Sequence, residues 1–189
     1  MAVKKASEIP TIDVNLVTVQ SEATSADEWI LDTASQIQVE PQIEEEEGVK
    51  LVVKGVLKAQ KLGTSTLTGN QITLTDNVFT PELVQLLQGG TVTKEQDGTV
   101  TGYTPPVAGS NEKGSIFTLK AYSAQYNAAG TIERYECISY PNCQGVPVAF
   151  NAEDGAFRSP EYTINSAPDI GEAPYTITYV NSLPTPVTT

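Results

Sequence analysis

The stretch LTDNVFTPELVQLLQGG, residues 74–90, predicts a short helix in a sequence that is otherwise typical of strands. Thr80 is a suitable N-cap, and Pro81 fits the first helical position, where an N–H would have no partner in any case. Gly89 and Gly90 end the helix, because glycine readily adopts the backbone conformation that follows a helix C-terminus. The pattern therefore bounds the helix at both ends.

The predicted helix, residues 81–88, carries its leucines on one face. Leu83, Leu86 and Leu87 recur at spacings of three and four residues, which brings them together along a helix. A helix of about two turns is unstable alone in water. We therefore expect these leucines to dock the helix against a larger element, a sheet.

Alternation of apolar and polar residues, the period of a half-buried strand, recurs along most of the remaining chain. Clear examples are 11–19, 36–43 and 49–60, and the stretch NAAG at 127–130 is typical of a hairpin turn. The pattern predicts a mainly β fold: a two-sheet β sandwich or barrel-like domain with one short α-helix covering a flank or open end. The stretch 23–35 fits a short helix or a strand equally well.

The 189 residues are predicted to form a single domain, 1–189. Within it we expect an N-terminal arm over about 1–10, a long loop over about 92–115 and a C-terminal tail over about 184–189. No run approaches the roughly 18 apolar residues of a membrane helix, and the first residues do not resemble a signal peptide. We therefore expect synthesis and residence in the cytoplasm.

Nothing in the sequence predicts catalysis or cofactor binding. The chain has no histidine to act as a general base, no glycine-rich phosphate loop and no nucleophile-elbow motif. Cys137 and Cys143 are interpreted as free thiols, because two sulfurs without histidine make a poor zinc site. A glycosidase-like pair among the many carboxylates stays open as an alternative. We expect a protein that is not an enzyme and holds no metal or cofactor.

Charge is distributed unevenly along the chain, whose formal net charge is −12. Residues 21–47 contain nine acidic residues and no lysine or arginine, and they end in Glu44, Glu45, Glu46 and Glu47. Because this run of glutamates lies between two strand-like segments, we expect it to form a hairpin loop. So acidic a chain is unsuited to ordinary nucleic-acid binding, which draws its affinity from lysine and arginine.

The next segment, 49–60, carries a lysine at every fourth position. In an unbroken strand these lysines would share one face, and the alternate apolar residues would be buried on the other face, inside the sandwich. The two sets are Lys50, Lys54 and Lys58, and Val49, Leu51 and Val53. Gly55 is a candidate β-bulge that would change the face beyond it.

Glutamates followed closely by lysines suggest contact between copies of the chain. We hypothesise that the three lysines meet acidic groups of a neighbouring copy, with Glu44–Glu47 as their partner. Complementary patches of this kind steer assembly and fix register more than they add affinity. The simpler interpretation, that both charged segments are solvated faces, stays open.

Four stretches resemble tail tube proteins of tailed bacteriophages and related phage-like particles. They are QIQVEPQIEEEEGVKLVVKGVLKAQK, ITLTDNVFTPELVQLLQGG, ISYPNCQGVPVAF and SPEYTINSAPDIGEAPYTITYVNSL, which together extend from residue 36 to 183. The resemblance implies a β sandwich with a short flanking helix. It also implies hexameric rings stacked into a hollow tube, whose inner wall is a barrel of strands from all copies in the ring. Loops and termini would reach between rings.

The resemblance further implies a structural role in the virion tail, assembled in the cytoplasm of a bacterial host. The partners would be further copies of the chain, a tape measure protein in the lumen, the tail terminator, baseplate or distal tail proteins, and a sheath where the tail has one. DNA would pass through the lumen without specific binding, and no membrane partner is implied. Acidic residues suit such a lumen, because a basic wall would retain the phosphates.

A second class of protein also fits the residues. An extracellular β-sandwich adhesin or surface-layer module would have similarly short, threonine-rich strands, although the sequence shows no export signal. Electron microscopy separates the two classes, because a tail tube protein forms rings or tubes of uniform width and an adhesin module does not.

Overall fold

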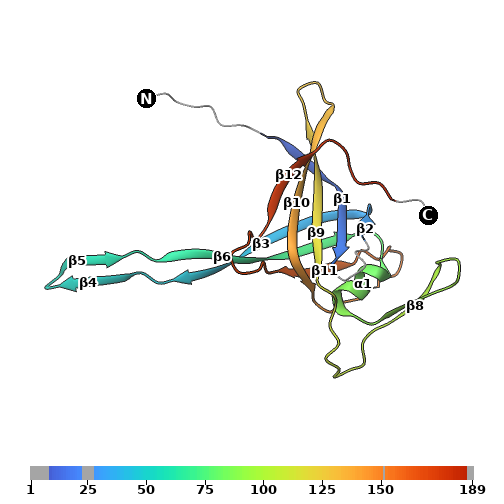
Figure 1. Cartoon of the computed structure of the whole chain (residues 1–189), viewed down its shortest axis with the longest axis horizontal. Coiled ribbons are helices and arrows are strands. Elements are labelled where there is room, and N and C mark those ends of the chain that lie inside the picture. The colour runs from blue at the N-terminus through green and yellow to red at the C-terminus, as the bar shows by residue number, and fades with distance from the viewer. Residues whose placement is uncertain (1–8, 23–27, 151, 187–189) are drawn as a thin grey trace.

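The computed structural model describes residues 9–22, 28–150 and 152–186, and these consist mainly of antiparallel strands (Figure 1). The strands of the main sheet are β1 (Thr11–Ser21), β2 (Glu28–Leu31), β3 (Ala34–Glu46), β6 (Thr64–Asp76), β9 (Phe117–Tyr126), β10 (Ile132–Gly145), β11 (Glu161–Ser166) and β12 (Thr176–Val180). They pair in the order β2-β1-β9-β10-β11-β6-β3. β12 pairs with the first half of β10, and β11 pairs with the end of β10.

Two small ribbons and one helix complete the described structure. The first ribbon pairs β4 (Val49–Val53) with β5 (Val56–Lys61), and the second pairs β7 (Thr91–Lys94) with β8 (Val100–Thr104). The helix, α1 (Pro81–Gln88), follows β6 directly. Its bounds confirm the predicted helix.

The main sheet curls around its own apolar side chains. β1 lies near one end of the sheet order and β3 at the other, yet the two strands contact each other. Register shifts between Tyr140 and Cys143 and between Ile12 and Leu16 accompany this curl, since an extra residue bends and twists a strand. Within the described part of the chain no ladder joins the two ends, so the barrel is not closed.

The predicted mainly β fold with one short helix is therefore confirmed. The expected sandwich had two separate sheets. In the structure, the two layers that enclose the core are instead parts of one curled sheet. The cause is the length of β10, which carries β9 on one edge and both β11 and β12 on the other. A single strand thus belongs to both layers.

The main core lies inside this curl. Its fully buried side chains include Val17, Val19, Ile72, Leu74, Val84, Phe117, Leu119, Tyr162 and Ile164. A smaller cluster of Leu16, Tyr122 and Cys137 packs on the other face of the sheet, where Val180 and Leu183 cover it.

The leucine face of α1 is buried in the main core. Leu83, Leu86 and Leu87 are 2%, 6% and 1% exposed. A Cβ added to Gly145 of β10 would lie 2.4 Å from Leu87, so the helix sits directly on the sheet at this point. Gly89, at φ 83°, ends the helix and donates its N–H to the Gln85 carbonyl.

The structure contains the turn predicted at 127–130 and differs from the loop predicted over 92–115. Asn127 closes the β9–β10 hairpin, because its side-chain oxygen accepts hydrogen bonds from the N–H groups of Ala129 and Thr131. The loop expected over 92–115 is only partly a loop, since it contains most of the β7–β8 ribbon. The apolar-polar alternation of VTK and VTGYT on either side of a turn at Gly98 explains this ribbon.

Most of the predicted N-terminal arm, and residues 187–189 of the predicted C-terminal tail, lie outside the described residues. Of the stretch 23–35, whose structure the sequence left open, residues 28–31 form β2. Pro184, Thr185 and Pro186 of the tail lie beside this strand.

Truncating a helix leucine is expected to destabilise the subunit. Leu86→Ala should lower the free energy of unfolding by about 2–5 kcal/mol, because it leaves a cavity in the core. The matched control is Leu62→Ala, at a leucine that is 71% exposed, where a change within about 0.5 kcal/mol is expected. Chemical denaturation of the monomeric subunit measures both. Equal losses in the two variants would contradict the docking of α1.

Candidate assembly interface

A long two-stranded projection leaves the body of the molecule. β3 and β6 run past the core and continue as β4 and β5, forming the extended hairpin in Figure 1. Every residue from 40 to 68 is exposed. We call residues 40–68 the arm, and the β4–β5 hairpin the arm tip.

The chain reverses direction in the middle of a segment expected to be one strand. Lys54 and Gly55 have φ values of 51° and 80°, and they connect β4 to β5 as a two-residue turn. Positive φ at both central residues is the pattern of a type I′ hairpin turn. The prediction of one unbroken strand over 49–60 is therefore wrong, and Gly55 marks the turn rather than a bulge. A register shift does occur nearby, opposite Leu51 and Val52.

The cross-strand register assigns the side chains of the arm tip to two faces. Val49 pairs with Lys61, Leu51 with Ala59, and Val53 with Val56, and cross-strand partners project from the same face. This face, which we call the apolar tip face, consists of Val49, Leu51, Val53, Val56 and Ala59, with Lys61 at its end. Lys50, Val52, Leu57 and Gln60 lie on the opposite face.

The apolar tip face is uncovered, contrary to the expectation that Val49, Leu51 and Val53 would be buried inside the sandwich. Val49, for example, is 67% exposed. The reason is the register of the whole hairpin, which carries this segment beyond the edge of the core. An isolated two-stranded hairpin is at best marginally stable in water, and a contiguous exposed apolar surface marks an interaction site. The arm is therefore the candidate interface.

The acidic run forms part of the arm rather than a loop, which corrects the sequence expectation. Glu44, Glu45 and Glu46 lie in β3 and pair with residues 64–66 of β6, and only Glu47 follows the strand. Glu46 forms an ion pair with Lys61 of the same arm. Because both side chains are more than half exposed, this pair contributes little to stability.

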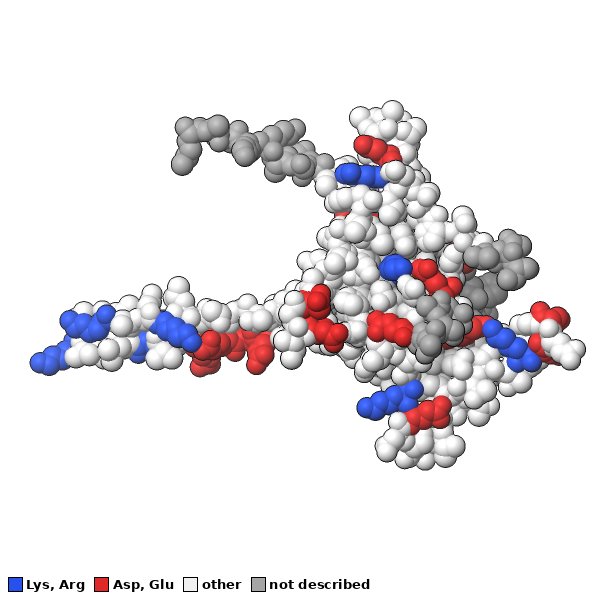
Figure 2. Space-filling view, in the orientation of Figure 1, with Lys and Arg blue, Asp and Glu red and all other residues white. Residues whose placement is uncertain are grey.

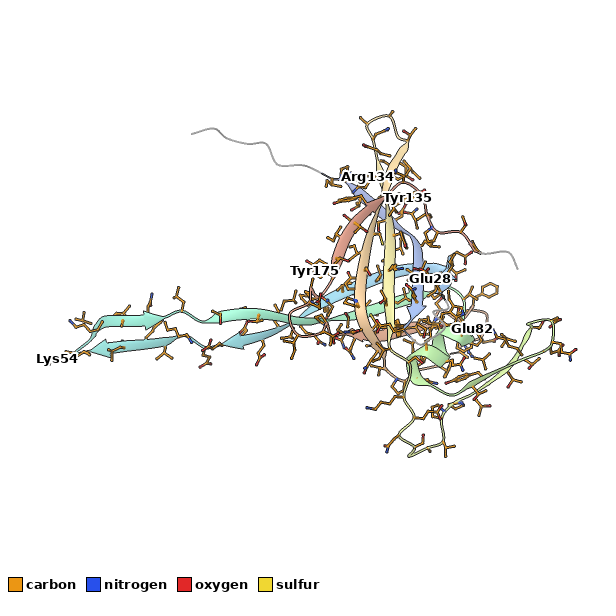
Figure 3. The ribbon with its side chains drawn as sticks, in the orientation of Figure 1. Glu28, Lys54, Glu82, Arg134, Tyr135 and Tyr175 are labelled. Carbon is orange, nitrogen blue, oxygen red and sulfur yellow. The ribbon has the colours of Figure 1, made fainter. Side chains whose placement is uncertain are left out.

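The three lysines of the predicted set are all at the arm tip. Lys50 lies on β4, Lys54 at the turn and Lys58 on β5, with Lys61 close by (Figure 3 labels Lys54). Figure 2 shows the blue lysines at the far end of the arm and a red glutamate patch nearer the body. Residues 50–61 carry a charge of +4, the other arm residues carry −5, and the residues outside the arm carry −11, which gives the net charge of −12. The arm tip and the body therefore have opposite charge.

Burial keeps one thiol and two phenols of the core neutral at physiological pH. Burial raises the pKa of the Cys143 thiol to about 12, and burial likewise raises the pKa values of Tyr140 and Tyr162 to about 12. A thiol with a raised pKa is a poor nucleophile at neutral pH. Both cysteines are free, as interpreted from the sequence, and the structure buries both of them.

The described residues contain neither a metal-binding cluster nor a membrane-spanning helix. No group of three or more acidic, cysteine or histidine side chains there could hold a metal ion. No helix in the described ranges is long and apolar enough to cross a membrane.

Comparison with known proteins does not assign the chain to a family. No protein-family model matches the sequence, and none of the curated proteins does. Among solved structures, the chain is similar to one chain of the six-fold symmetrised cryo-EM structure of the anti-feeding prophage (AFP) baseplate. That similarity covers 95% of this chain and 98% of the other, with a TM-score of 0.36 and 9% identity. At this level of similarity neither a family nor a role follows.

The arm tip is expected to be dispensable for folding of the subunit. Replacing Val49–Lys61 with an Asn-Gly turn should change the free energy of unfolding by less than about 1 kcal/mol, because the removed residues are exposed. Thermal and chemical denaturation of the monomer measure the change. A loss of several kcal/mol, or of cooperative unfolding, would show that the arm tip belongs to the core.

Proposed function

We propose that this protein is a structural subunit that polymerises, and specifically the subunit of a phage-type tail tube. The observation that carries the proposal is the arm: its tip has an apolar face that no described part of the chain covers, and a second molecule would cover it in an assembly. In the proposed assembly, subunits form hexameric rings that stack into a tube, and the arms connect subunits. The role is mechanical and involves no catalysis.

The charge of the chain supports a conduit for DNA. With −12 overall and +4 confined to the arm tip, the body is strongly acidic. A wall of carboxylates repels phosphates and leaves DNA mobile along the axis, whereas lysine or arginine would bind it cumulatively. Burial of the arm-tip lysines between subunits would remove the main cluster of cations from the lumen. DNA would then pass through during ejection without specific binding.

The proposed assembly also defines the other partners and the location. A tape measure protein would occupy the lumen before DNA passes, and terminator and baseplate or distal tail proteins would cap the two ends. The protein would be found in the tail of a virion or phage-like particle after assembly in the bacterial cytoplasm. An adhesin or surface-layer module, the alternative class, would function as a separate domain and would leave the arm uncovered.

Purified protein is expected to form hexameric rings that stack into tubes of uniform width. Mass measurement across a range of concentrations, together with negative-stain electron microscopy, tests this. The variant that lacks Val49–Lys61 should remain folded and fail to form tubes, because the covering of the apolar tip face is lost. A wild-type protein that stays monomeric at all concentrations, with no tubes in particles, would contradict the proposal.

Charge reversal at the arm tip is expected to weaken assembly without unfolding the subunit. Lys50→Glu, Lys54→Glu and Lys58→Glu combined should raise the concentration needed for assembly at low salt, whereas Lys113→Glu outside the arm should not. Above about 1 M salt, where the screening length is roughly 3 Å, the triple variant and wild type should become alike. Sedimentation at both salt concentrations measures this. Equal assembly of the triple variant and wild type at low salt would show that the lysines form only a solvated face.

A further inference from the structure

One side of the curled sheet stays uncovered beyond the core. Tyr175, Ile177 and Tyr179, on and just before β12, alternate along the chain and project from one face. Ile177 pairs with Ile138, which packs against the main core, so this face continues the core side of the sheet. The exposed fractions of the three side chains are 41%, 47% and 42%.

A second set of exposed apolar side chains lies where the arm leaves the body. These side chains belong to β3 and β6 and face the same side of the sheet as the core. Ile37 and Val39 of β3 pack against the main core, and Ile43 follows at the same alternation. The register shift near Ile43 adds its extra residue to β6, so the alternation along β3 is unbroken. Leu67 is the cross-strand partner of Ile43, and the two are 37% and 54% exposed.

We call these five side chains the open core face: Ile43, Leu67, Tyr175, Ile177 and Tyr179. The Asn70 side chain of β6 donates a hydrogen bond to the Pro174 carbonyl and so connects the two layers beside Tyr175. Deeper in the body the two layers that carry them enclose the main core between them. Farther out, the five side chains of the open core face are only partly covered by their own chain. Figure 1 shows β12 on the side of the body from which the arm leaves, and Figure 3 places Tyr175 there.

We propose that the open core face is the seat for the arm tip of a second copy, with the apolar tip face packed against it. The proposal rests on the polymerising function proposed above and names the surface that receives the arm. Both surfaces are uncovered β faces, and two such faces pack well with interdigitating side chains. Joining them covers two exposed apolar surfaces in one contact.

Charge favours the same pairing. Glu45 is on the same face as Ile43, and Glu136 is the cross-strand partner of Tyr179, so both carboxylates border the seat. The incoming arm tip carries four lysines and no acidic residue. Arg134 also borders the seat, but it is engaged within its own chain. Its guanidinium carbon lies 4.2 Å from the centre of the Tyr179 ring, and its Nε donates a hydrogen bond of 2.6 Å to Gln125 Oε1.

The pairing has a direct consequence for symmetry. Each copy offers one arm tip and one seat, on different parts of its surface. In the proposed rings the tip of one copy enters the seat of the next, so the contact is heterologous. Heterologous contacts build rings when the rotation closes and open filaments when it does not. Each arm tip that enters a seat therefore adds one copy to the assembly. The apolar side chains of a seat are covered only when a neighbour supplies its arm tip.

Site-directed cross-linking of the assembled protein tests the seat. In the double variant Leu51→Cys and Ile177→Cys, a short bismaleimide should join neighbouring chains into ladders of covalent oligomers. The native thiols are buried and should react little. The control pairs Leu51→Cys with Thr101→Cys, at an exposed position of β8, and should give no ladder. Independently, Ile177→Lys should raise the concentration needed for assembly by about tenfold or more while the subunit stays folded.

The outcomes separate this inference from the proposed function. Ladders from the 51–177 pair, with none from the control, support the seat. Tubes that form normally, give no 51–177 ladder and cross-link instead from Leu51→Cys to Glu44→Cys, on the face of β3 opposite to Ile43, would overturn the seat and favour the acidic run as the partner. If tubes form and Ile177→Lys leaves assembly unchanged, the seat is also wrong. Failure of the wild type to assemble at all would contradict the proposed function itself.

Discussion

An apolar β surface in water must be covered, and this constraint explains both the compact body and the extended arm. In the body, one sheet satisfies the constraint by curling until β1 contacts β3, with α1 closing over the side chains between them. In the arm the same constraint is unmet by the residues that the structure describes. Two strands make one layer, and one layer cannot cover itself.

The body and the arm share two strands, so the arm is a continuous extension of the main sheet. β3 and β6 are each 13 residues long, and they form the core at one end and the root of the arm at the other. A force or a contact applied to the arm is therefore transmitted directly into the hydrogen-bonded ladder of the body. The proposed tube subunit would require this continuity, since its arms would hold neighbouring copies in register.

Local signals in the sequence were sufficient for the helix and for the class of fold. Thr80, Pro81 and Gly89 define α1 through their own backbone preferences, and the leucine spacing defines its buried face. The alternation of apolar and polar residues likewise predicted strands throughout the chain. These features could be predicted because each depends on residues that are neighbours in the sequence.

The arm could not be predicted in the same way. Lys-Gly is a weaker turn signal than Asn-Gly or Asp-Gly, so β4 and β5 looked like one strand. The position of Glu44–Glu47 between two strand-like segments suggested a loop, but pairing with Thr64–Thr66 keeps Glu44–Glu46 in β3. Most importantly, an apolar face buried by another copy has the same sequence pattern as one buried in the chain's own core. The pattern shows that Val49, Leu51 and Val53 need cover, and not which molecule provides it.

The central claim is that the arm tip is covered only by assembly. Hydrogen exchange of the backbone amides of residues 49–61, compared between dilute monomer and assembled protein, tests it most directly. We predict that these amides exchange quickly in the monomer, while those of β9 and β10 are protected, and that they become protected in the assembly. If the amides of residues 49–61 exchange at the same rate in the monomer and in the assembly, whether that rate is fast or slow, the account is contradicted.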